Sequence, residues 1–176
     1  MAILKVIHKS YFSGQFSDKK YHDSDALCDV ISYCLLPAKT PSKLVGGFGV
    51  DVMCAVEQME LLALAYRKDS GVRLRHFVLS FQAKERIDKQ RAFFLAQNIA
   101  MFYGGMYQII FAVHEDTARP HIHFVMNTVS YIDGRKYAGD KSDYFSFQQH
   151  VRNLLWGSNR FRLIVVPDSM SSKRDF

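Results

Sequence analysis

Three histidines lie close together in the stretch His114-Glu-Asp-Thr-Ala-Arg-Pro-His-Ile-His123. Side chains at positions i and i+2 of a strand point to the same face, roughly 7 Å apart, so His121 and His123 can flank one ion. His114 ends the preceding predicted strand, and a short loop returns it beside His121 if the two strands pair. Three imidazoles from two strands form an open metal site that leaves positions for water or a phosphate oxygen.

Asp116 follows the first of these histidines and can serve the same site. It can accept a ring N–H and fix a histidine tautomer, which metal-binding histidines usually require. An imidazole set of this kind suits zinc, nickel or manganese, and it does not by itself name the metal.

A tyrosine lies on a predicted helix upstream of the histidines. The helix begins near Ser24 or Asp25, either of which can cap it, and Pro37 ends it. Its apolar residues recur at helical spacing and form one stripe, made of Leu27, Val30, Ile31 and Cys34. Tyr33 lies about 100° from the centre of that stripe, on the flank of the buried face. This position fits a packing residue as well as a nucleophile.

The elements that position these residues follow from hydrophobic periodicity. We expect strands at 3–7, 73–81, 107–114, 121–129 and 162–166, and helices from 24 or 25 to 36, from 51 to 66, at 90–103 and at 145–156. Asp51 is expected to cap the second helix, Gly46 to Gly49 to form flexible backbone, and Gly104-Gly105 to end the third helix in a left-handed stop. Helices and strands alternate without a convincing linker, which predicts one α+β domain.

Composition narrows the class of protein. The chain has 176 residues, 48% of them hydrophobic, and a net charge of +6, so a packed core is expected and a polyanionic partner is favoured. No apolar stretch is long enough to span a membrane, and Lys5, His8 and Lys9 interrupt any signal-peptide core. Cys28 and Cys34 are typical of a reduced compartment, so we expect a cytoplasmic protein.

Read with its flanks, the stretch HEDTARPHIHFVMN resembles the third motif of the relaxase/mobilisation nuclease family, the P class of conjugative relaxases in the HUH endonuclease superfamily. Two further motifs occur in the order of the family. The first is a helical tyrosine before a loop with proline, lysine and threonine, Ile31-Ser-Tyr-Cys-Leu-Leu-Pro-Ala-Lys-Thr40. The second is a strand ending in Ser-Phe, His76-Phe-Val-Leu-Ser-Phe81. The resemblance covers roughly residues 3–165.

The resemblance implies a role for each matching residue. Tyr33 would be the nucleophile, Ser80 would lie near the DNA backbone, and Asp116 would support a ligand or assist the tyrosine proton. The metal ligands would be His114, His121 and His123, with Asn127 in the shell around them. The implied metal is Mg²⁺ or Mn²⁺ in cells, although the imidazoles can also hold Zn²⁺ or Ni²⁺.

The implied fold is a central antiparallel sheet of about five strands flanked by helices, the palm-like fold of HUH endonucleases. Residues 1–167 would form the N-terminal nuclease domain, and 168–176 a polar tail that can lead into a further C-terminal region. The implied activity is nicking of single-stranded DNA at an origin of transfer through a 5′-phosphotyrosine, with a free 3′-OH. Accessory DNA-binding proteins and proteins of the conjugation machinery would be partners.

Basic residues beside the predicted site are candidates for phosphate contacts, and these are Lys39, Lys43, Arg75, Lys84 and Arg119. Rolling-circle replication initiators and single-tyrosine transposases resemble the same histidine motif but carry the tyrosine after it, which would make Tyr144 the nucleophile. Two interpretations from other classes stay open: a noncatalytic nucleic-acid-binding module whose histidines pair within the sheet, and a metal-dependent hydrolase of small molecules. The basic charge and the lack of an obvious glutamate base weigh against the hydrolase.

Overall fold

A central sheet of six strands organises the part of the chain that the computed structural model describes, which is residues 1–7, 11–12, 15–16, 21–82, 87–117, 120–159 and 162–166. In order across the sheet the strands are β4 (Val45–Phe48), β6 (Tyr107–His114), β7 (His121–Ser130), β5 (Leu74–Phe81), β1 (Ala2–Ile7) and β8 (Leu163–Val166). The pair β1 and β8 is parallel, and the other neighbours are antiparallel. In a separate two-stranded sheet, β2 (Tyr11–Phe12) pairs antiparallel with β3 (Gln15–Phe16).

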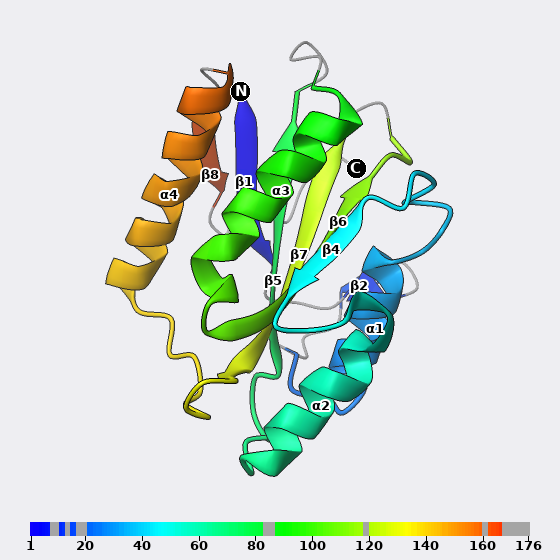
Figure 1. The fold of residues 1–176 in the computed structure, drawn as a ribbon, viewed down its shortest axis with the longest axis vertical. Coiled ribbons are helices and arrows are strands. Elements are labelled where there is room, and N and C mark those ends of the chain that lie inside the picture. The colour runs from blue at the N-terminus through cyan, green and yellow to red at the C-terminus, as the bar shows by residue number, and fades with distance from the viewer. Residues whose placement is uncertain are drawn as a thin grey trace.

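Four α-helices cover the two faces of this sheet within the described residues: α1 (Ala26–Cys34), α2 (Ala55–Ala65), α3 (Lys89–Gly104) and α4 (Lys141–Asn159). One face, with Phe111 and Phe124, packs on α3 and α4, and the other, with Ile110 and Val125, packs on α1 and α2. Figure 1 shows α1 and α2 packed together, apart from α3 and α4. The predicted α+β fold is therefore confirmed, with six strands instead of about five and one parallel pair at the edge.

Gly46 and Gly47, which we expected to be flexible backbone, are strand residues of β4, and Gly49 lies just beyond that strand. Gly46 and Gly47 pair with β6, and a Cβ atom on Gly46 would lie 2.4 Å from Cζ of Phe111. Glycine is needed here because the Phe111 ring of the neighbouring strand occupies the place of a side chain.

The ends of the helices follow the predictions in part. The Asp51 side chain accepts a hydrogen bond from the Met53 backbone N–H and caps a 3-10 turn, η1 (Val52–Cys54), that leads into α2. The expected left-handed stop after α3 is wrong, because Gly105 has a φ of −76°. Gly104 instead lets the helix approach β4, since a Cβ atom on it would lie 2.7 Å from Cβ of Phe48.

Strand alternation decides which polar residues share a face. On β5, His76 pairs with Val125 and Ser80 with His121, so both point to the face covered by α1 and α2. Arg75 alternates with them and points to the opposite face. Among the described residues no helix is both long and apolar enough to cross a membrane.

Candidate metal centre

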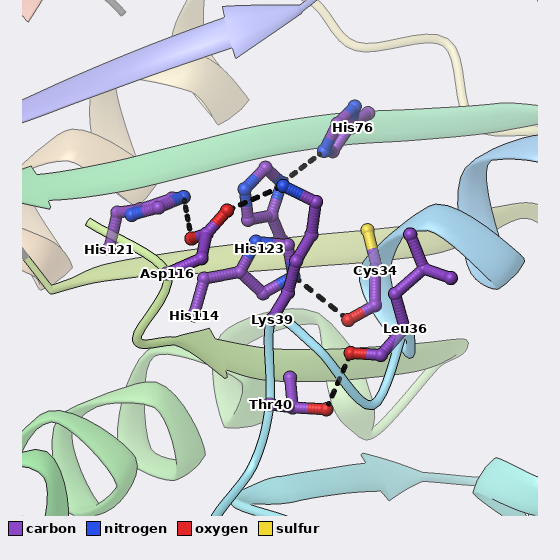
Figure 2. A network of polar contacts seen from close by, with 9 residues as sticks. All are labelled: Cys34, Leu36, Lys39, Thr40, His76, His114, Asp116, His121 and His123. Atoms are coloured by element: carbon purple, nitrogen blue, oxygen red, sulfur yellow. Dashed lines mark hydrogen bonds and ion pairs between the residues drawn. The ribbon is translucent and has the colours of Figure 1, made fainter.

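Three histidines converge at the end of the β6–β7 hairpin, on the face covered by α1. His114 pairs with His121 across the two strands, and His123 lies two residues further along β7. One ligand nitrogen from each histidine lies within 4.8 Å of those of the other two. The ring centroids are 4.2 to 5.1 Å apart, and Figure 2 shows the rings facing a common point. The predicted ligands are thus brought together.

The tautomer of His114 is set by the end of α1. Its Nε2–H donates to the Cys34 carbonyl oxygen at 2.9 Å, because a carbonyl can only accept. Nδ1 therefore carries the lone pair, and this buried atom has no hydrogen-bond partner among the described residues. Burial lowers the pKa of His114 to about 4, so the ring is neutral near pH 7. A buried, unpartnered lone pair fits a metal ligand.

A second chain of hydrogen bonds orients His123. Its Nδ1 lies 2.9 Å from Nε2 of His76, and Nδ1 of His76 lies 3.3 Å from the hydroxyl of Tyr21. Nε2 of His123 is buried without a partner among the described residues. Burial is the largest cause that lowers the pKa of His123 well below its usual value, and the neighbouring His76 is the next largest. If Nδ1–H donates to His76, the lone pair of His123 is on the atom that faces the other two histidines.

His76 and Tyr21 are residues that sequence reasoning did not single out. His76 is 6% and Tyr21 3% exposed, and burial lowers the pKa of His76 to about 3. His76 lies in the Ser-Phe strand motif, but its contact with His123 depends on how β5 and β7 pair, and the sequence does not state that register. The sequence signal that could have found His76 is its spacing of four residues from Ser80, which puts both side chains on the same face of a strand.

The third histidine lies beside a carboxylate. His121 Nε2 is 3.9 Å from Asp116 Oδ1, and Lys39 Nζ is 2.5 Å from Asp116 Oδ2. Burial alone would raise the pKa of Asp116, but the hydrogen bond and the charge of Lys39 lower it below its usual value. Asp116 is therefore an anion at neutral pH, placed between a ligand ring and an ammonium group (Figure 2).

Tyr33 lies over the same cluster. Its ring centroid is 5.7 Å from that of His114 and 5.6 Å from that of His123. The predicted flank position on α1 is confirmed, because the stripe residues are buried whereas Tyr33 is 37% exposed. A phenol in this position is accessible from solvent and close to the metal ligands at once.

Some predicted site residues join this cluster and others do not. Ser80 lies directly opposite His121 in the β5–β7 pairing. Asn127 is a correction, because it lies four residues beyond His123 on β7, roughly 13 Å away at ~3.3 Å per residue. Its side-chain amide donates to Met59 O and Gln108 Oε1 and holds α2 against the sheet.

Arg75 does not lie with this cluster, because alternation along β5 places it on the other face of the sheet. There its guanidinium lies 4.9 Å from the centroid of the Tyr137 ring. Tyr144 lines the same hollow, of about 300 Å³, together with Arg75 and Phe77. The alternative nucleophile is thus separated from the histidines by the sheet.

The remaining candidates are only partly described. Lys43 is exposed in the loop between α1 and β4. Lys84, Arg119 and the tail at 168–176 lie outside the described residues, so their expected roles stay predictions.

Cys34, His76 and His123 form a second group whose ligand atoms lie within 4.8 Å of one another. The two histidines of this group are already joined at 2.9 Å, a hydrogen-bond separation, and His123 belongs to both groups. Burial raises the pKa of the Cys34 thiol, which keeps it protonated. The group of His114, His121 and His123 is therefore the better metal site.

Comparison with known families gives a match that covers most of the site. The family model "Relaxase: MobA/VirD2-like, nuclease domain" matches residues 33–155, more than half of the chain. The matched region contains the tyrosine, the serine and all three clustered histidines. Searches of curated proteins and of solved structures gave no match.

Proposed function

We propose that this chain, which belongs to the relaxase family of MobA/VirD2-like nuclease domains, nicks single-stranded DNA by tyrosine attack at an origin of transfer. One observation carries the proposal: the Tyr33 ring lies within 6 Å of the rings of two candidate metal ligands, at 5.7 and 5.6 Å between centroids. A phenol and a cation can then engage the same phosphorus.

In the proposed reaction the Tyr33 oxygen attacks the scissile phosphate. A bond forms between this oxygen and phosphorus, and the bond from phosphorus to the 3′ oxygen breaks. The products are a 5′-phosphotyrosine and a free 3′-OH, and a later 3′-OH can reverse the reaction and close the strand. The phosphate energy is kept in the covalent link, as transfer and mobilisation of a DNA element require.

His114, His121 and His123 would hold a divalent cation. Their fit to this role rests on two buried ring nitrogens without partners among the described residues, His114 Nδ1 and His123 Nε2, and on the lowered pKa of both rings. A bound divalent ion would supply positive charge to the non-bridging oxygens of the attacked phosphate. We propose Mg²⁺ or Mn²⁺ in cells, although the imidazole set also accepts Zn²⁺ or Ni²⁺.

The other residues of this face would position the DNA. Ser80, opposite His121, can donate its hydroxyl to a backbone oxygen next to the nick. Lys43, Lys84 and Arg119 are proposed to contact phosphates, which would make affinity fall with salt. Accessory DNA-binding proteins and proteins of the conjugation machinery would bind at the same origin as further partners. We also propose that the protein acts in the cytoplasm.

A covalent trapping experiment tests the proposal. The protein is incubated with Mn²⁺ and a labelled pool of random single-stranded oligonucleotides, and a denaturation-resistant protein–DNA band is sought. We expect the parent and a Tyr144→Phe variant to form the band and a Tyr33→Phe variant to lose it. Tandem mass spectrometry of the adduct identifies the modified tyrosine. An adduct that persists in Tyr33→Phe would refute the assignment.

A further inference from the structure

The sequence predicts that Lys39 binds DNA phosphate, but in the structure its side chain contacts other groups of the protein. It lies in the loop 35–44, which joins α1 to β4. Its Nζ is 2.5 Å from Asp116 Oδ2 and 4.8 Å from the centroid of the Tyr33 ring. Figure 2 shows the Lys39 side chain reaching across to Asp116, beside the histidine cluster. The ammonium therefore contacts the candidate nucleophile and a carboxylate of the candidate metal site.

Hydrogen bonds hold the loop 35–44 against the end of β6. The Glu115 backbone N–H donates to the Lys39 carbonyl oxygen at 2.8 Å. The Glu115 carboxylate accepts from the backbone N–H of Ser42 at 3.3 Å and from its hydroxyl at 3.2 Å. Lys89, from α3, lies 3.4 Å from the same carboxylate. The backbone at Lys39 is thus held by contacts that do not involve its own side chain.

Lys39 carries a positive charge at neutral pH. Burial alone would lower its pKa, but the hydrogen bond to Asp116 and the proximity of Tyr33 raise it above the usual value. Its side chain is 22% exposed and that of Asp116 25%, so the pair is only partly screened by water. A phosphate would have to compete with Asp116 for this ammonium, which makes Lys39 a poorer DNA anchor than an unpaired surface lysine.

We propose that Lys39 is a catalytic residue whose ammonium, held by Asp116, stabilises the negative charge on the Tyr33 oxygen. This inference rests on the function proposed above. As the phenol loses its proton and its oxygen bonds to phosphorus, the electron pair of the breaking bond goes to the 3′ oxygen, which gains a proton. The net proton transfer is from the phenol to the new 3′-OH, and Lys39 keeps its own protons throughout. In strand closure the same ammonium stabilises the Tyr33 oxygen as it leaves.

The experiment separates catalysis from DNA binding. The rate of adduct formation is measured with Mn²⁺ at saturating single-stranded DNA, and DNA affinity is measured over a salt series with EDTA present to prevent cleavage. The variants are Lys39→Met, Lys39→Arg and, as a matched control, Lys68→Met at an exposed lysine just beyond the end of α2.

We expect Lys39→Met to lower the saturated rate by about 100-fold, the size of effect seen when one group that stabilises developing charge is removed. Its DNA affinity should stay within about twofold and its salt slope unchanged, because no phosphate contact is lost. Lys39→Arg should recover part of the rate, and Lys68→Met should match the parent.

Two results would overturn the inference. One is a Lys39→Met protein with a normal saturated rate but weaker, less salt-dependent DNA binding, which would make Lys39 a phosphate contact. The other is a rate loss that Lys39→Arg does not recover at all, which would make the role structural. A parent protein that forms no adduct would instead refute the proposed function, so the two failures are distinguishable.

Discussion

Nε2 of His76 on β5 lies 2.9 Å from Nδ1 of His123 on β7, and this hydrogen bond joins two buried rings of neighbouring strands. The other nitrogen of His76 contacts Tyr21, 55 residues earlier in the chain. The contact fixes the direction of the His123 ring, and with it the nitrogen that faces His114 and His121. A residue that touches no metal can therefore control how well the metal is held.

Changing His76 to leucine should weaken metal binding by about 10- to 100-fold, the usual cost of removing such a supporting partner. His76→Gln keeps a hydrogen-bond acceptor and should recover part of the affinity. Isothermal titration with Mn²⁺ measures the effect. His150→Leu is the matched control, because it removes a histidine hydrogen bond to Asn98 O away from the candidate site. Equal Mn²⁺ affinity in His76→Leu and the parent would show that His76 does not orient His123.

Metal removal should lower thermal stability by mass action. A ligand at 100 times its dissociation constant stabilises the folded state by about 2.7 kcal/mol, so the melting temperature should rise with Mn²⁺ concentration and fall again with EDTA. His114→Ala and His121→Ala should lose this dependence, whereas His22→Ala, at an exposed position, should keep it. Differential scanning calorimetry checks this, and a Mn²⁺ response that survives in His114→Ala would place the ion elsewhere.

Acid should destabilise the metal-free protein before most carboxylates titrate. Burial lowers the folded-state pKa of His76 to about 3 and that of His114 to about 4, both from 6.5. Between pH 6.5 and 4 the unfolded chain therefore binds more protons, and the free energy of unfolding falls as pH falls. Each histidine contributes up to ~1.4 kcal/mol per pH unit in this window, and the contribution is fully present above pH 6.5.

Urea unfolding in EDTA at several pH values measures this slope. His76→Gln should lower the number of protons taken up on unfolding by about one, and the slope falls in proportion. His22→Gln is the control for loss of a histidine. A parent protein whose stability is flat from pH 6.5 to 4.5 would contradict the buried, neutral state of these rings.

Two adjacent glycines should respond oppositely to alanine. At Gly104 a Cβ atom would lie 2.7 Å from Cβ of Phe48, so Gly104→Ala must push α3 from β4 and should cost about 1–3 kcal/mol. At Gly105 nothing lies within 4 Å of the added Cβ and φ is −76°, so Gly105→Ala should be neutral or stabilise by up to ~1 kcal/mol. Urea denaturation of both variants checks the pair. Equal stabilities would mean that α3 and β4 are not in this close contact.

The sequence by itself predicted the parts of the site that depend on short spacing. His121 and His123 share a face because a strand repeats every two residues, and the short loop before them returns His114 to the same place. The helical repeat likewise placed Tyr33 on the flank of a buried stripe. These periodicities are local, so they can be read without knowing the partner strands.

Only the tertiary structure decided the contacts between distant segments. His76 and His123 are 47 residues apart, and Lys39 and Asp116 are 77 apart, so their contacts depend on strand register and on the path of a loop. Arg75 lies on the far face because side chains alternate along β5, and Asn127 lies four residues beyond His123 along β7. A one-residue shift in pairing would reverse the face of every β5 side chain, and the order of residues along the chain does not specify that pairing.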